Sequence, residues 1–247
     1  MNFTYLPPVP AEQIRQLPTR DVALLLAQHL ASSSTPLLQF DGLIGSARQA
    51  FQNEPDAHAL LHGLADAWAW LESRALLSRV PSQSEAFRRL SREGMELAKD
   101  PEGITRFQAH ERLSGPLHPA LEGTVRTNFS LGDYETACFA AMKAVEVAVR
   151  DASGLNSLVG VHLMRAAFQP HQNGKVGGAL ADAGAEGGEQ EAASALFAGA
   201  MGAYKNPASH RTVDFDDPIE AAEIIQFADL LLRQVERTKR RQVEASA

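Results

Sequence analysis

The sequence predicts a mainly α-helical protein of two domains. Apolar residues recur at helical spacing in several segments of the 247-residue chain, which is long enough for more than one core. The stretch 101–118 interrupts this pattern with two prolines, two glycines and scattered charge, and it has no sustained apolar stripe. We therefore expect an N-terminal domain over residues 1–100, a connector over 101–118 with one short helix, and a helical C-terminal domain over 119–247.

Helices dominate the N-terminal domain, but the period of its apolar residues changes near its end. Three helices are expected, over residues 21–31, 41–52 and 56–77. The longest carries apolar residues at helical spacing, namely Leu60, Leu61, Leu64, Trp68, Leu71 and Ala75. The next segment, "SRVPSQSEAFRRLSREGMELA", indicates an extended run, a polar turn, a second extended run around Phe87 and Leu90, and a final helical turn. A small hairpin is therefore expected after the third helix.

This order of helices and hairpin resembles a winged helix-turn-helix domain. The resemblance rests on "AWAWLESRALLSR" and "FRRLSREGMELA", which would form an aromatic-rich helix and a strand–turn–strand wing. The arginines placed to face phosphates on that helix end and wing are Arg74, Arg79, Arg88, Arg89 and Arg92. They predict binding of nucleic acid, including DNA. The alternative is the solvated face of a protein-interaction module, which Glu72, Glu85 and the net charge of −7 favour.

The C-terminal domain is expected to be a small helical bundle. Its helices are expected over residues 119–130, 133–152, 156–168, 189–204 and 218–241. Asp133 is placed to cap the second of these helices and Gly154 to end it. The last helix has Asp217 as its N-cap and Pro218 at its first position. Residues 170–190 contain six glycines and little bulk, which predicts a mobile loop.

Four phrases of this domain resemble a known family. In chain order they are "LHPALEGTV", "GDYETACFAAMKAVEVAVRDASG", "LFAGAMGAYKNPASHR" and "EAAEIIQFADLLLRQVE". Together they resemble the Ymh type, a family of uncharacterised bacterial proteins, over nearly all of the C-terminal domain. That family is placed in the HEPN superfamily of helical domains, many of which are RNases. The resemblance therefore implies a HEPN-like helical bundle.

The HEPN signature is an arginine, four to six intervening residues and a histidine, often with a polar residue directly after the arginine. Lys205 and His210 reproduce the spacing and Asn206 is the polar follower, but lysine stands in place of arginine. Superfamily members with this signature cleave RNA without a metal, as dimers whose motifs face each other. The resemblance implies a homodimeric, metal-independent endoribonuclease in a phage-defence or toxin–antitoxin setting. Because lysine lacks the bidentate fork of arginine, the alternative is a degenerate relative that binds RNA without cutting it.

Cleavage of RNA requires a base for the ribose 2′-hydroxyl, a cation for the phosphate and an acid for the leaving 5′-oxygen. His210 can act as acid or base because imidazole titrates near neutral pH. Lys205 or Arg211 can offset charge on the phosphate, and Asn206 can donate to it or orient His210. Tyr204 could stack on a base. The structural alternative is that the same residues only end a helix, with Tyr204 closing it against the core.

A polar row on the helix over 133–152 supplies a further candidate. Lys143, Glu146 and Arg150 follow i, i+3, i+7 spacing and share one stripe of an otherwise apolar helix. Pattern alone predicts a surface salt-bridge row of little energetic weight. HEPN domains often carry an acidic residue here that faces the motif, so the resemblance implies that Glu146 holds His210 or Lys205 in place.

Composition excludes several other functions. The single cysteine, Cys138, rules out a disulfide within the chain, and its apolar setting predicts a buried side chain. The sequence shows no signal peptide and no apolar run as long as a membrane span, so we expect a cytoplasmic protein. His58 and His62 lack the further ligands of a zinc site, and neither metal nor cofactor is expected. The competing function is a non-enzymatic nucleic-acid-binding or scaffolding protein whose helical domain serves dimerisation.

Overall fold

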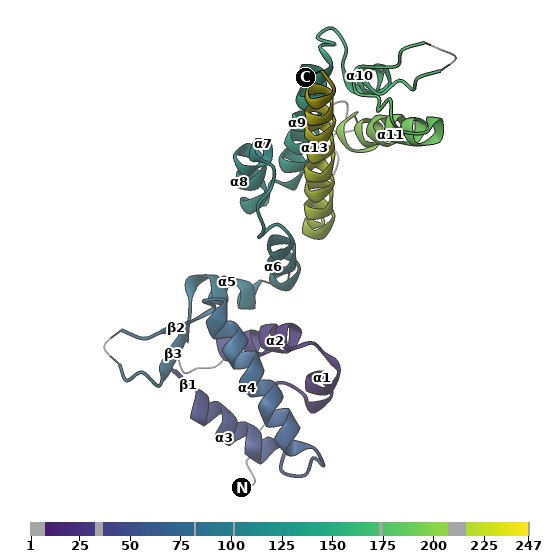
Figure 1. The fold of residues 1–247 in the computed structure, drawn as a ribbon. Helices are drawn as coiled ribbons and strands as arrows, with labels where there is room; N and C mark the ends of the chain where they lie inside the picture. Colours follow the sequence, from purple (N-terminus) through teal and green to yellow (C-terminus); the bar gives the residue numbers. More distant parts are fainter. Residues whose placement is uncertain are drawn as a thin grey trace. The chain divides into compact units, whose positions relative to one another are not determined.

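The computed structural model is mainly helical and forms two compact units, Met1–Phe107 and Gln108–Ala247 (Figure 1). It describes residues 8–32, 37–81, 83–100, 102–172, 175–206 and 216–246. The two units divide within the stretch 101–118, which contains helix α6 (Gly103–Arg112). In these ranges no helix is both long and apolar enough to cross a membrane.

The N-terminal unit is built around the long helix α4. Its helices are α1 (Ala11–Gln16), α2 (Thr19–Ser32), α3 (Phe40–Ala50), α4 (Ala57–Ser73) and α5 (Arg92–Lys99). The core side chains Leu24 and Leu26 of α2 and Leu60 and Leu64 of α4 are at most 1% exposed. Helices α2, α3 and α4 confirm the three helices expected here, but the third ends earlier than expected. Ala75, expected on its apolar stripe, instead has φ +55°, which turns the chain out of the helix.

A three-stranded antiparallel sheet completes this unit. It consists of β1 (Leu38–Gln39), β3 (Phe87–Leu90) and β2 (Leu77–Arg79) in that spatial order. The hairpin of β2 and β3 was expected from the sequence, and its register pairs Leu77 with Leu90. The short strand β1 was not expected, because two residues are too few to show an alternating pattern.

Helices α9 (Tyr134–Ser153) and α13 (Pro218–Ser246) lie side by side at the centre of the C-terminal unit (Figure 1). The other helices are α7 (Pro119–Glu122), α8 (Thr124–Ser130), α10 (Gly160–Ala167), α11 (Gly187–Ala200) and the π-helix η1 (Met201–Lys205). The expected caps of α9 are confirmed, since Asp133 accepts from the third N–H of the helix at 3.1 Å and Gly154 has φ +70°. The single helix expected over 119–130 is wrong, because Gly123 takes a non-helical conformation and separates α7 from α8.

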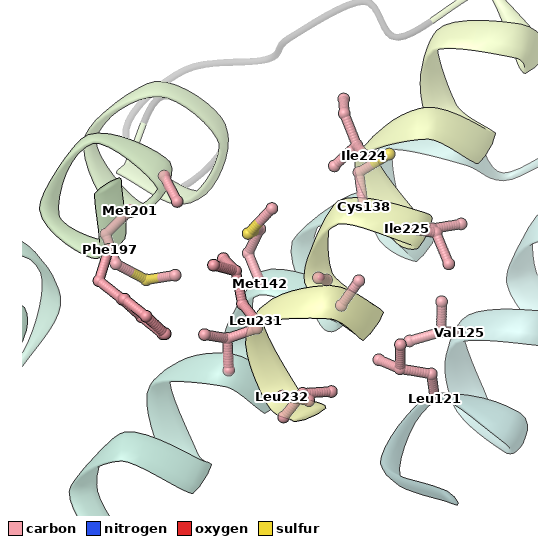
Figure 2. Close-up of a cluster of buried hydrophobic side chains, with 14 of the residues drawn as sticks. Leu121, Val125, Cys138, Met142, Phe197, Met201, Ile224, Ile225, Leu231 and Leu232 are labelled. Atoms are coloured by element: carbon pink, nitrogen blue, oxygen red, sulfur yellow. The ribbon is translucent and has the colours of Figure 1, made fainter. Parts of the chain in front are cut away.

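The core of this unit lies where α9, α13 and the α11–η1 helix meet. Figure 2 shows Met142 of α9 close to Leu231 of α13, with Phe197 and Met201 facing them from α11 and η1. All four side chains are at most 2% exposed. Burial of each stabilises the fold by about 1.5–3 kcal/mol relative to leaving it in water. Cys138 belongs to the same core, as expected, and its burial raises the pKa of its thiol to about 12.

Part of the segment 170–190 packs onto the bundle. Leu180 is 2% exposed and its N–H donates to the carbonyl of Ala167 at 2.8 Å. Gly178 lies so close to the main chain of α10 that an added Cβ would collide with the carbonyl of Ala167. Gly177 and Gly178 therefore allow close packing, and the expected mobility of the segment stays a prediction.

Candidate functional site

The first residues of the HEPN-like motif lie at the end of one continuous helix. After α11 the chain widens into the π-helical turn η1, and Asn206 still has helical φ and ψ of −63° and −42°. π-Turns are rare and occur frequently at functional sites. The helix thus runs through Lys205 and Asn206, whereas the sequence predicted an end at Tyr204. Residues 207–215, which include His210 and Arg211, lie outside the described residues.

Glu146 is the buried centre of an ionic cluster. It lies on α9 and is 5% exposed. The Nζ atom of Lys205 lies 3.4 Å from each of its carboxylate oxygens. The Nη2 atom of Arg150 lies 3.5 Å from Oε2, and the main-chain N–H of Gly160 donates to Oε1 at 2.5 Å.

These contacts explain why a carboxylate is tolerated inside the bundle. A buried charge is costly unless it is paired and hydrogen-bonded. Glu146 has two cations as partners, and its hydrogen bond to Gly160 satisfies an N–H at the start of α10, where the helix dipole favours negative charge. The carboxylate therefore joins three elements: its own helix, α10 and η1.

Asn206 lies beside the same cluster. A Cβ added to Gly160 would lie 3.5 Å from the Oδ1 atom of Asn206. Gly160 itself has φ +57°, a conformation that side-chain-bearing residues rarely adopt. No pattern in the sequence marks Gly160 as part of this site, since its role depends on its main-chain N–H.

The three residues of the polar row expected on the surface of α9 differ in exposure. Lys143 is exposed, whereas Glu146 is buried and Arg150 is partly buried. The prediction of a surface salt-bridge row is therefore wrong for Glu146. The contact with Lys205, which the family resemblance implied, is present between residues far apart in the sequence.

Tyr204 contacts the core of the bundle. Its ring meets that of Phe227 edge-on, with 6.1 Å between the centroids, and its side chain packs against the hydrophobic core. This geometry is that of the structural alternative, in which the aromatic ring closes the helix against the core. It disfavours stacking of this ring on a base.

The five arginines of the wing region have partners within the N-terminal unit. Arg79, Arg88 and Arg92 pair with glutamates at N–O distances of 3.1, 2.5 and 3.3 Å. The guanidinium of Arg74 lies over a tryptophan ring at 5.5 Å, and Arg89 donates to a main-chain carbonyl at 3.4 Å. Three of the five arginines are thus paired with carboxylates, and binding of nucleic acid by this region stays a prediction.

The remaining candidate, the histidine pair of α4, has no metal-binding surroundings. The rings of His58 and His62 lie against each other with 4.5 Å between centroids. Over the part of the chain that the structure describes, no three side chains are grouped to hold a metal ion.

Comparison with known families agrees with the C-terminal resemblance. Residues 115–235 match the model of a family described as "Protein of unknown function (Hypoth_ymh)". The match spans every residue of the ionic cluster. It supports the Ymh-type resemblance for this part of the chain. No curated protein and no solved structure matches the chain.

Proposed function

We propose that the C-terminal unit is a metal-independent endoribonuclease of HEPN type that acts as a homodimer. The observation that carries this proposal is the ion pair between buried Glu146 and partly buried Lys205, because Lys205 is the first residue of the motif. The resemblance implied an acidic residue on this helix that faces the motif. The pair, with Asn206 beside it, supports a shared site at the end of η1.

The charge of the cluster suits a phosphodiester. Two cations, Lys205 and Arg150, contact the carboxylate of Glu146. The side chains of Lys205 and Arg150 are 16% and 25% exposed, which limits screening by water. A phosphodiester carries one negative charge, and charge that builds up during cleavage is stabilised by cations already in position.

In the proposed reaction His210 takes the proton of the ribose 2′-hydroxyl, and the 2′-oxygen attacks the phosphorus. The bond to the 5′-oxygen breaks, and a protonated group, such as the histidine of the partner protomer, returns a proton to the leaving oxygen. The products are a 2′,3′-cyclic phosphate and a 5′-hydroxyl. Glu146 acts as a positioning residue that holds the ammonium of Lys205.

A second candidate is a relative that binds RNA without cutting it. The observation that favours it is the nature of the cation, since an ammonium paired with a buried carboxylate offers no planar fork for two phosphate oxygens. The same site would then bind the RNA backbone by charge alone.

The deciding experiment incubates the full-length protein with mixed tRNA and mRNA in EDTA. The wild type is compared with His210→Ala, with Lys205→Arg, which restores the signature, and with Lys143→Gln as a matched control on exposed α9 surface. We expect cleavage that leaves 2′,3′-cyclic ends, is abolished in His210→Ala, persists in Lys205→Arg and is unchanged in Lys143→Gln.

Other outcomes assign the site differently. Intact RNA with a gel shift that His210→Ala and Lys205→Gln weaken would support the RNA-binding relative. If folded wild-type and Lys205→Arg proteins leave the RNA intact and cause no gel shift, both the endoribonuclease and the RNA-binding relative are overturned. The scaffolding function would then remain.

A further inference from the structure

A pocket of about 510 Å³ opens in the C-terminal unit between α11, the last turns of α13 and the segment 180–185. Its volume lies in the range of small-molecule sites. None of the residues of the ionic cluster lines it. It is therefore a separate site, and a ligand could bind there whether or not the protein cleaves RNA.

The floor of the pocket is apolar. The rings of Phe168 and Phe197 lie nearly parallel with 4.1 Å between centroids, and Leu180 is buried beside them. Leu196 also lines the pocket and is 41% exposed, so it adds accessible apolar surface to the pocket. The α11 wall is completed by alanines, including Ala193, whose small side chains leave the space open.

The rim of the pocket carries an ion pair and also a cation that can bind a ligand. Asp182 is paired with Arg241 at 2.7 Å. The carboxylate of Glu189 accepts from the main-chain N–H of Glu186 at 3.2 Å, so it is held at the start of α11. Arg237 also lines the pocket, is exposed, and makes no hydrogen bond or ion pair with any other residue that the structure describes. The rim thus offers a guanidinium to an anion.

We propose that this pocket binds a small amphiphilic anion. The ligand has an apolar body, aromatic or acyl, that lies against the stacked phenylalanines, and one carboxylate, sulfonate or phosphate that pairs with Arg237. Arginine suits this role because its planar guanidinium donates two parallel hydrogen bonds to such groups. The partial exposure of Leu196 is explained in the same way, since the ligand would cover it.

The test uses two fluorescent probes that differ in charge. The first, 8-anilinonaphthalene-1-sulfonate, has an aromatic body and one anionic group, and the second, N-phenyl-1-naphthylamine, lacks the sulfonate. We expect one saturable sulfonate site per full-length chain. Arg237→Gln should raise the Kd for the sulfonate probe by about tenfold or more and that of the neutral probe by less than twofold. Arg240→Gln, on the same helix but outside the pocket, should change neither by more than about twofold.

A filling variant locates the binding. Ala193→Phe should abolish binding of both probes. The milder Ala192→Leu, at a neighbouring alanine that also lines the pocket, should weaken both, and circular dichroism checks the fold of each variant. Unchanged binding in a folded filling variant would overturn the proposal, as would equal losses in Arg237→Gln and Arg240→Gln. If the wild type binds no probe and a filling variant changes its mass in light scattering, the pocket is a protein interface and the proposal fails.

Discussion

Replacement of Glu146 by alanine is expected to destabilise the C-terminal unit by about 3 kcal/mol. Removing one side of a buried ion pair costs about 3–5 kcal/mol, because the other charge stays buried without compensation. Here Lys205 and Arg150 would both lose their carboxylate, and the N–H of Gly160 would lose its acceptor. The two cationic side chains are long and partly exposed, so their charged ends can move toward water, which places the expected loss at the lower end.

Glu146→Gln separates charge from shape. Glutamine keeps the volume of the side chain and an oxygen for Gly160, but it loses the negative charge and places an NH2 donor where a carboxylate oxygen faced a cation. We expect a destabilisation of about 1.5–3 kcal/mol, the usual contribution of a hydrogen bond to a charged group. The matched control is Asp151→Ala, an exposed carboxylate on the same helix, with an expected effect within about 0.5 kcal/mol.

Unfolding of the C-terminal unit, which carries Glu146, can be measured separately from unfolding of the N-terminal unit. Cys138 is the only cysteine of the chain and is buried in α9, so its labelling by a thiol reagent in urea reports unfolding of the C-terminal unit alone. With a slope of about 2 kcal/mol per M urea, a loss of 3 kcal/mol shifts the midpoint by about 1.5 M. A shift in Glu146→Ala no larger than that of Asp151→Ala would refute the reasoning, and equal shifts in the alanine and glutamine variants would show that the lost charge, not the lost shape, accounts for the cost.

Three further predictions concern the same unit. The thiol of Cys138 should react in the native protein at pH 8 at least about a thousandfold more slowly than in urea, measured with a disulfide reagent, because its pKa is raised from 9.0 to about 12. Gly178→Ala should cost about 1–3 kcal/mol in urea unfolding, because its Cβ would press on main-chain carbonyls. The guanidinium of Arg126 and the N–H of Leu117 hold the pKa of Glu122 below its ordinary 4.5. The stability that Glu122 contributes is therefore full above pH 4.5 and is lost as the pH falls through the folded-state pKa of Glu122. The stabilities of Glu122→Gln and the wild type should therefore become equal in acid, as measured by unfolding followed with circular dichroism.

Local chemistry explains which elements could be predicted from the sequence. Helices α9 and α13 have clear caps, and Asp133, Gly154 and Asp217 each take the expected position. Ala75 and Gly123 were assigned to helices because helical spacing continues across them, but their main-chain conformations end the pattern. Spacing shows which side chains share a face and does not show what covers it.

The same limit applies to the ionic cluster. The i, i+3, i+7 pattern placed Glu146 on a stripe with an exposed lysine and gave no reason to bury it. Only the family resemblance implied its contact with Lys205, because the partner lies 59 positions away in the chain. The sequence did not reveal the role of Gly160 in the site, because that role depends on a main-chain N–H, which the residue type does not identify.

A carboxylate at this position is not explained by stability alone. Apolar side chains of similar volume can replace a buried ion pair at little or no cost, so Glu146→Met/Lys205→Met should be less destabilised in urea than Glu146→Ala, although Arg150 and the N–H of Gly160 still lose their partner. If the pair serves the proposed RNase, the same double variant should lose RNA cleavage while Lys143→Gln keeps it. A stable double variant with full activity would show that the pair is dispensable for the chemistry. A double variant as unstable as Glu146→Ala would instead assign the pair to the fold, because the packing of α9 against η1 would then depend on the charges themselves.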